Sequence, residues 1–263
     1  MNNLKRKNLI IIPGSCSDPL NWFDQICFYE KQGWQVGFLD LDAAKYKTIR
    51  DCAEAMELAL DNLVNEETVI MSHSMGAMLM FKVLVISKNI RLQNLFKKVK
   101  IFFIQMPCES KALNVIKATF ILIEIIIFLH KCLILWWLEP LLYFLKSSFA
   151  FGYQIAWVKP INTFINFCSM NNSFWKASPD EFRGLINYYE TWQEIFENMN
   201  FDLTHYENLY FTYGEPDPVC DSDLIKEIGW KFPNVNVLEM NGSFHNPQHL
   251  PWFQKRFDDL ILG

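Results

Sequence analysis

The fold is decided by residues 68–76, which read Thr-Val-Ile-Met-Ser-His-Ser-Met-Gly. Residues 68–71 are apolar or β-branched and predict a buried strand. Residues 77–87 are mostly apolar and predict a helix directly afterwards. The chain must therefore turn sharply between the strand and the helix, and Ser74 lies at that turn.

Small residues flank Ser74 at the two positions where a sharp turn requires them. A larger side chain two residues before or after a nucleophile on such a turn would strike the neighbouring backbone, and Ser72 and Gly76 both meet that limit. The following helix directs its first N–H groups at the turn, where the N–H of Met75 can bind a developing oxyanion. Ser74 is therefore the candidate nucleophile.

A serine hydroxyl is a poor nucleophile at its own pKa and needs a general base. Among the five histidines, His245 is our candidate, because it lies in a loop directly after an expected strand at residues 235–240. Open α/β sheets place functional groups on loops beyond the carboxyl ends of their strands. His249, at the start of the last expected helix, is the reserve.

The other histidines receive different interpretations. His73 adjoins the nucleophile, and adjacent side chains on a sharp turn diverge, so we expect it to contact substrate instead of acting as the base. His130 lies in an apolar segment, which favours a buried core or pocket position. His205 lies where the pattern of the chain changes, and an exposed surface position accounts for it.

A catalytic histidine also needs an acid that fixes its tautomer and stabilises its cation. Asp217 is the candidate, because it lies in a Gly-Glu-Pro-Asp-Pro turn directly after the expected strand at residues 208–213. Glu215 and Asp221 are nearby alternatives. The three candidate residues then follow one another in the order serine, aspartate, histidine.

Strand and helix patterns alternate on both sides of this constellation. Such alternation is typical of an α/β fold with a mostly parallel central sheet and helices on both faces. The expected strands are residues 8–12, 34–41, 68–71, 99–105, 208–213 and 235–240. The expected helices are residues 18–32, 49–64, 77–87, 222–229 and 249–262.

Residues 108–206 interrupt the alternation with apolar helical runs, which predicts an all-helical lid inserted between two core segments, residues 1–107 and 207–263. A lid of this size has little core of its own, so we expect it to pack over the carboxyl edge of the sheet and enclose an apolar pocket. Aromatic residues crowd within it. Those that we expect to bind substrate are Trp136, Trp137 and Tyr143.

At this point the sequence resembles the α/β-hydrolase superfamily, across nearly all of its length outside the insertion. The resemblance is carried by four motifs: Pro13-Gly14-Ser15, Ser72-His73-Ser74-Met75-Gly76, Gly214-x-x-Asp217 and Gly242-x-x-His245. It implies an α/β-hydrolase fold with Ser74 as nucleophile, Asp217 as acid and His245 as base. It also implies an oxyanion hole made by the N–H groups of Ser15 and Met75.

Two positions depart from the family pattern. Ser72 stands where the G-x-S-x-G elbow of the family has its first glycine. Pro13 stands where the family has the histidine of a His-Gly pair that opens the oxyanion loop.

Composition excludes several other classes of protein. The net charge of −5 argues against a nucleic-acid partner. The seven cysteines follow no CxxC or metal-binding spacing, so we expect reduced thiols, a cytoplasmic location, no metal and no cofactor. Residues 113–145 are strongly apolar, but Glu124 would lie mid-bilayer, which favours a buried helix pair over a membrane span. Peripheral contact of this segment with a membrane surface is a further hypothesis.

The main functional hypothesis is a serine hydrolase that cleaves a carboxylic ester or thioester of a hydrophobic acyl or isoprenoid-like substrate. One alternative is a lyase, cyclase or oxygenase reaction on the same scaffold, with His245 still the base. Another is a ligand-binding protein with a vestigial triad. The sequence indicates neither the acyl and leaving groups nor an oligomeric state.

Overall fold

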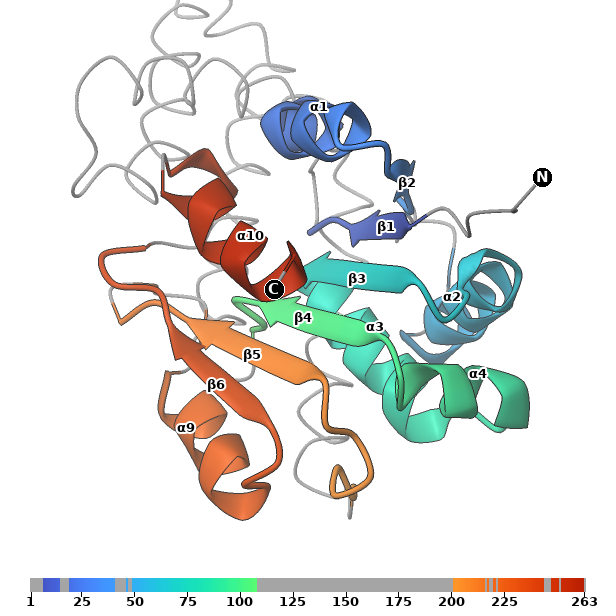
Figure 1. Cartoon of the computed structure of the whole chain (residues 1–263). Coiled ribbons are helices and arrows are strands. Elements are labelled where there is room, and N and C mark those ends of the chain that lie inside the picture. The colour runs from blue at the N-terminus through green and yellow to red at the C-terminus, as the bar shows by residue number, and fades with distance from the viewer. Residues whose placement is uncertain are drawn as a thin grey trace, which may run out of the picture.

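The structure, a computed structural model, describes most of the two predicted core segments. The described residues are 7–14, 19–40, 46, 49–107, 201–215, 217, 220, 222–243, 247–250 and 252–262. Their strands form one parallel sheet in the order β2-β1-β3-β4-β5-β6 (Figure 1). The strands are β1 (Asn8–Ile12), β2 (Gln35–Phe38), β3 (Thr68–His73), β4 (Lys100–Ile104), β5 (Leu209–Tyr213) and β6 (Asn236–Glu239).

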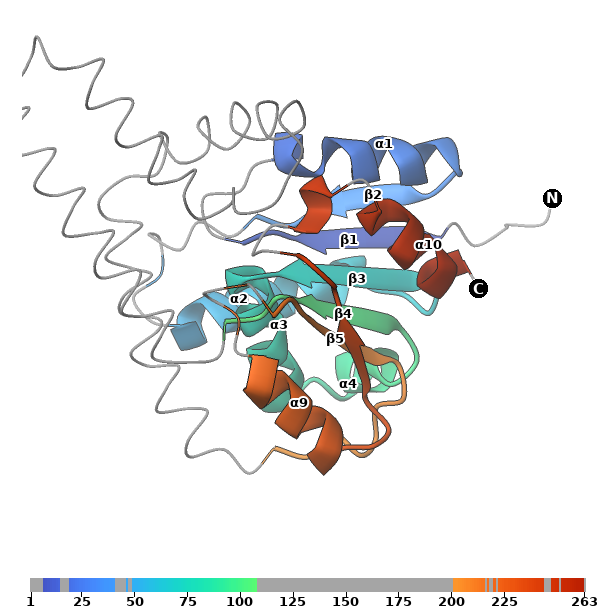
Figure 2. The ribbon, with the colours of Figure 1, turned by 90° about the vertical axis from the view of Figure 1, so that its left-hand side faces the viewer.

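Helices cover both faces of this sheet, which confirms the predicted α/β class (Figures 1 and 2). Helices α1 and α10 pack on one face, and α2, α3, α4 and α9 pack on the other. The helices are α1 (Phe23–Lys31), α2 (Ile49–Leu63), α3 (Met75–Ile86), α4 (Ile90–Phe96), α9 (Ser222–Lys231) and α10 (Phe253–Leu262). Short 3₁₀ turns, η1 (Pro19–Trp22) and η4 (Pro247–His249), precede α1 and α10.

The inner strands β1, β3, β4 and β5 are mostly apolar because both of their faces are buried, whereas the edge strands β2 and β6 are only partly buried. In β1, Leu9 and Ile11 face the α1/α10 side, whereas Ile10 and Ile12 face the α2/α3 side. All four side chains are at most 3% exposed. A half-buried strand would have alternated apolar and polar residues instead.

Helix α3 is fixed to the sheet by an aromatic cluster. Phe81 contacts Phe103 and Phe211 edge-on, at 5.9 and 6.1 Å between ring centroids, and these two rings stack on each other at 4.5 Å. Phe201 also contacts Phe81 edge-on, at 5.2 Å between ring centroids. These contacts pack α3 against β4 and β5.

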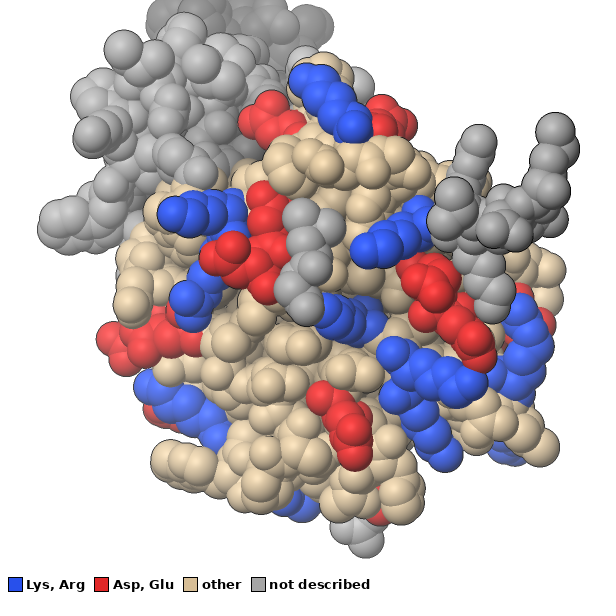
Figure 3. All heavy atoms as spheres, in the orientation of Figure 1, with Lys and Arg blue, Asp and Glu red and all other residues tan. Residues whose placement is uncertain are grey.

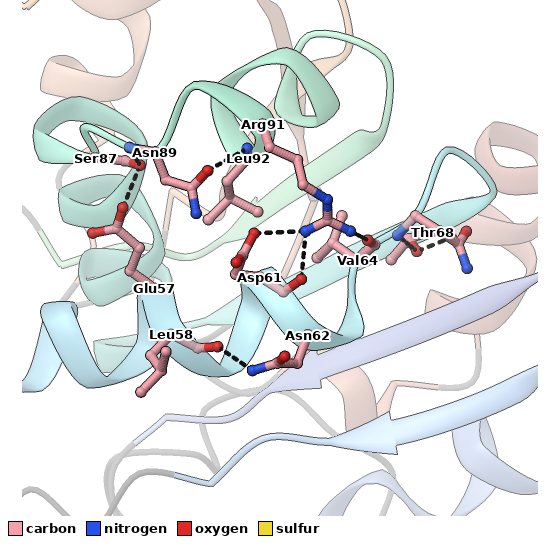
Figure 4. Close-up of polar contacts among 11 residues, drawn as sticks. Glu57, Leu58, Asp61, Asn62, Val64, Thr68, Ser87, Asn89, Arg91 and Leu92 are labelled. Carbon is pink, nitrogen blue, oxygen red and sulfur yellow. Dashed lines mark hydrogen bonds and ion pairs between the residues drawn. The ribbon is translucent and has the colours of Figure 1, made fainter.

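Polar contacts join α4 to α2 at the edge of the same layer (Figure 4). Arg91 donates to the Asp61 carboxylate at 2.6 Å, and the Ser87 hydroxyl donates to Glu57 at 2.6 Å. The Asn89 side chain caps α4 by accepting the Leu92 N–H at 3.1 Å. The sequence analysis did not predict α4, because it is only seven residues long.

Element ends differ from the predictions by a few residues. Strand β3 continues to His73, beyond the predicted end at residue 71, and α3 begins at Met75. The last helix begins at Phe253 and not at residue 249, because Pro247 opens a separate 3₁₀ turn before it.

Much of the predicted lid, residues 108–200 with Trp136, Trp137 and Tyr143, lies outside the described residues, as does the apolar segment 113–145. The end of the predicted lid is described: Leu203 and Tyr206 are buried in the core on the α2/α3 face of the sheet. Within the described part of the chain, no helix combines the length and apolar character that crossing a membrane requires.

Charged side chains of both signs are spread over the face seen in Figure 3, and several Lys and Arg side chains lie together at its lower right.

Candidate active site

Two of the predicted catalytic positions, Ser74 and Asp217, lie at the same edge of the sheet. Because all the strands are parallel, their carboxyl ends lie together, and the turns that follow β1, β3, β4, β5 and β6 share this edge (Figure 2). The chain goes from β1 to β2 on one side and then to β3 on the other, so the topological switch point lies between β1 and β3. Open α/β sheets bind ligands at such a point.

Ser74 lies at this switch point, between the end of β3 and the start of α3. Its backbone has φ 51° and ψ −121°, a left-handed conformation that is strained for a residue with a side chain. The turn is held by hydrogen bonds: the Ser74 N–H donates to the Ile104 carbonyl at 3.0 Å, and its own carbonyl accepts from Ala77 and Met78 at 3.0 and 3.1 Å. A serine before a helix usually caps it, yet the Ser74 hydroxyl does not cap α3.

Close packing around this turn explains the small residues of the motif. A Cβ on Gly76 would lie 2.5 Å from the Ile12 carbonyl oxygen, and a Cβ on Gly14 would lie 2.8 Å from the Ser74 Cβ and 3.4 Å from its Oγ. Ser72 fits where the family has glycine, because its hydroxyl is fully buried and donates to the Phe102 carbonyl at 2.7 Å. The loop after β1 therefore runs directly beside the Ser74 hydroxyl.

Of the two predicted oxyanion donors, the structure describes Met75 but not Ser15. Met75 is the first residue of α3, so its N–H belongs to the first turn, at the positive end of the helix dipole. Ser15 lies outside the described residues, although Gly14 beside it contacts Ser74.

His73, a predicted substrate contact, is the last residue of β3 and is only 2% exposed. Its ring meets Trp22 edge-on at 5.9 Å, and its Nδ1 lies 3.0 Å from the position of a Cβ on Gly14. Trp22 belongs to the core on the α1/α10 face. His73 therefore points into that face, beneath η1, and the prediction that it contacts substrate stays a prediction.

Asp217 follows β5, two strands away from β3 in the sheet, or about 10 Å across. It is 7% exposed, and its N–H donates to the Gly214 carbonyl at 3.0 Å, which closes the turn. Glu215, one alternative acid, is exposed and pairs with Lys226 at 3.5 Å. Asp221, the other alternative, lies outside the described residues. Burial at the carboxyl edge favours Asp217 over Glu215.

Tyr213, the last residue of β5, adds a neutral group beside this turn. Burial raises the pKa of its phenol, and the Glu239 carboxylate, which accepts its hydroxyl at 3.4 Å, raises it further. Tyr213 therefore stays protonated at neutral pH.

The candidate base His245 lies outside the described residues, and so does the side chain of the reserve, His249. The loop that leads to His245 is described. Gly242 has φ +69°, the left-handed conformation for which glycine is suited, and the Ser243 N–H donates to the Met240 carbonyl at 2.9 Å. His205 lies at the other, amino edge of the sheet, exposed and 4.0 Å from Asp202, so it cannot reach Ser74.

Gln105 is a residue at this edge to which the sequence assigned no role. It follows β4 directly, is fully buried and has φ 48°. Its side-chain Nε2 donates to Ser243 Oγ at 2.5 Å. The signal in the sequence was weak. A single polar residue follows the apolar strand β4, and Ser74 and Asp217 lie in the turns after the strands on either side of it.

No group of three or more His, Cys, Asp or Glu side chains among the described residues is arranged to hold a metal ion. The groups that the described site offers are a hydroxyl, a carboxylate and backbone N–H donors, which suit nucleophilic chemistry.

Comparison with known proteins gives the same fold. No protein-family model matches the sequence, and no curated protein matches it. Solved structures do match, with sequence identities low enough that only the fold is shared. A carboxylesterase from the thaumarchaeon Nitrososphaera gargenis is 16% identical with a TM-score of 0.65, covering 100% of this chain and 91% of its own.

Two bacterial structures match similarly. An esterase from Exiguobacterium antarcticum is 10% identical with a TM-score of 0.65, covering 98% of this chain and 92% of its own. The carboxylesterase CesB from Bacillus subtilis is 13% identical with a TM-score of 0.60, covering 99% and 85%. Together with the parallel sheet and the turn at Ser74, these likenesses confirm the resemblance at the level of the fold: the chain has the α/β-hydrolase fold.

Proposed function

We propose that this chain is a serine hydrolase that cleaves a carboxylic ester or thioester through an acyl-enzyme on Ser74. The observation that carries the proposal is the strained turn at Ser74. A serine with φ 51° between a parallel strand and a helix presents its hydroxyl at the carboxyl edge, beside Gly14 and the first turn of α3. Strained backbone of this kind persists where function requires it.

The mechanism assigns one task to each group. His245 removes the proton from Ser74 Oγ, which attacks the carbonyl carbon and forms a tetrahedral intermediate. The N–H groups of Met75 and Ser15 stabilise its oxyanion. Collapse expels the alcohol or thiol, which takes the proton from His245, and water activated by His245 then releases the acid. Asp217 orients the imidazole and remains ionised throughout.

Three lines of evidence support ester hydrolysis. Asp217 is buried at the same edge as Ser74, as an orienting carboxylate must be. The neighbours from Nitrososphaera gargenis and Bacillus subtilis are described as carboxylesterases. Aromatic residues in the predicted lid, Trp136 and Trp137 among them, favour a substrate with an extended hydrophobic acyl or isoprenoid-like part.

Hydrolysis of p-nitrophenyl esters with acyl chains of two to sixteen carbons tests the proposal. The wild type is expected to turn over medium and long chains faster than acetate, and Ser74→Ala is expected to lose at least about a thousandfold in kcat. A sharp preference for acetate would refute the hydrophobic substrate class. An unchanged rate in Ser74→Ala would refute the nucleophile.

Ser74→Ala and His245→Ala together separate the alternatives. A lyase, cyclase or oxygenase reaction predicts that His245→Ala is inactive while Ser74→Ala keeps part of the activity. A ligand-binding protein with a vestigial triad predicts one equivalent of product per chain and no turnover.

A further inference from the structure

Gln105 contacts β5, the strand that precedes the turn of the proposed acid, and the loop that leads to the proposed base. Its side chain is fully buried at the end of β4, where Nε2 donates to Ser243 Oγ at 2.5 Å. Its backbone N–H donates to the Thr212 carbonyl at 3.2 Å and lies 3.3 Å from the Thr212 hydroxyl. The backbone of Gln105 thus bonds to β5, whereas its side chain bonds to the loop that contains Ser243.

Ser243 is fixed from its other side by the acid turn. It is fully buried, and a Cβ on Gly214 would lie 2.5 Å from its Oγ and closer still to its carbonyl oxygen. Gly214 also accepts the Asp217 N–H at 3.0 Å. Ser243 therefore fits between Gln105 and the turn that holds Asp217, two residues before His245 in the sequence.

The segment around Gln105 also reaches the other parts of the site. The preceding carbonyl, that of Ile104, accepts the Ser74 N–H at 3.0 Å. Two residues later, Pro107 forms an antiparallel bridge with Cys220, beyond the acid turn. Residues 104–107 thus contact the nucleophile turn, the strand before the acid turn, Cys220 after that turn and the loop that leads to His245.

This placement is unfavourable for Gln105 itself. Its φ of 48° is in the left-handed region, and its buried Oε1 has no hydrogen-bond donor in the described part of the chain. An apolar side chain would fill the same space without burying an amide. Among the described contacts, the hydrogen bond to Ser243 accounts for a buried amide at this position.

We propose that Gln105 is a positioning residue that, through Ser243, sets the loop of His245 against the turn of Asp217. The inference rests on the proposed triad, because the geometry it controls is that of acid and base. Gln105 itself contacts no substrate in this account. Its loss should let the imidazole stray from Ser74, and a displacement of about 1 Å at a catalytic group can lower the rate a hundredfold.

The test uses Gln105→Met, which keeps the length of the side chain, together with Ser243→Ala and the double variant. Kinetics with a p-nitrophenyl ester are measured well below the melting temperature, with the pH profile of kcat/KM and the rate of fluorophosphonate labelling. Asn234→Ala is the matched control, because the Asn234 amide donates to the Leu203 and Tyr206 carbonyls at 2.8 Å, at the opposite edge of the sheet.

We expect Gln105→Met to lower kcat and the labelling rate about 10- to 100-fold, to leave KM within about threefold, and to shift the acid limb of the pH profile. The double variant should lose no more than the larger single loss, since both changes break one hydrogen bond. Asn234→Ala should lower the melting temperature without lowering kcat.

Wild-type kcat and labelling in Gln105→Met, or additive losses in the double variant, would overturn the inference while leaving the proposed function intact. If Gln105→Met does not fold, Ser243→Ala decides alone by the same measurements. A wild type that neither hydrolyses esters nor reacts with the fluorophosphonate would overturn the proposed function, and the inference with it.

Discussion

Replacing Gly76 with alanine should impair catalysis far more than folding. The new Cβ would lie 2.5 Å from the Ile12 carbonyl oxygen, with the Pro13 carbonyl nearer still, whereas ordinary contact begins near 3.5 Å. Both obstacles are backbone atoms at the end of β1, so α3 and the Ser74 turn must move away by about 1 Å.

Two effects on stability partly cancel. Overpacking of this kind destabilises by about 1–3 kcal/mol, whereas alanine in place of glycine favours the helix by about 1 kcal/mol. The net loss should therefore be about 0–2 kcal/mol. Catalysis has no such compensation, and a shift of about 1 Å at the nucleophile predicts a loss of about a hundredfold in kcat/KM.

Urea unfolding and ester hydrolysis of the same preparations measure both effects. Gly229→Ala is the matched control: its Cβ would meet the Val237 Cγ2 at 2.7 Å, a side-chain atom of β6, which lies three strands from β3 in the sheet. We expect Gly229→Ala to keep full activity. Wild-type activity in Gly76→Ala, at unchanged stability, would mean that α3 does not abut β1 as described, and the geometry argued for Ser74 would be wrong.

Three further predictions concern other parts of the molecule. Lys82 is 7% exposed, and its pKa is lowered first by burial and then by the Arg50 charge, so its ammonium opposes folding at pH 7. Lys82→Met should therefore raise the melting temperature by about 2–4 °C, and a fall would contradict this account. Burial raises the pKa of Tyr29, and the Asp258 carboxylate, which accepts the Tyr29 hydroxyl at 3.2 Å, raises it further. The contribution of Tyr29 to stability is therefore complete below about pH 10 and is lost above it, because tyrosine in the unfolded chain then ionises. Thermal melts of Tyr29→Phe and wild type should therefore converge above about pH 10; a constant difference would refute the assignment. Flotation with liposomes tests the hypothesis that residues 120–145 dock on a membrane surface, and protein that stays at the bottom with neutral and anionic vesicles alike would end it.

The strands and the main turn could be predicted from sequence because their signals are local. Strand β1 was predicted to the residue, since an unbroken apolar run ends at Pro13-Gly14. Ser74 and Asp217 could be predicted to lie at one edge because each lies in the turn after a strand, and parallel strands bring such turns together. Helix α4 was not predicted, because no long apolar stripe follows its capping residue, Asn89.

The role inferred for Gln105 could not have been predicted in the same way. Its partner Ser243 is 138 residues away, and neither flanking sequence differs from an ordinary loop. The left-handed backbone at Gln105 is likewise set by tertiary contacts, because glutamine has no intrinsic preference for it. Local patterns thus identified which residues reach the edge, but not which of them hold the loops together.

The central claim is that the hydroxyl of Ser74 is an activated nucleophile. Mass spectrometry of the intact chain after reaction with a fluorophosphonate tests it most directly, followed by mapping of the modified peptide. We predict a single adduct on Ser74, absent from Ser74→Ala and formed much more slowly by His245→Ala and Asp217→Ala. A wild type without an adduct, or with its adduct on another serine, would contradict the account.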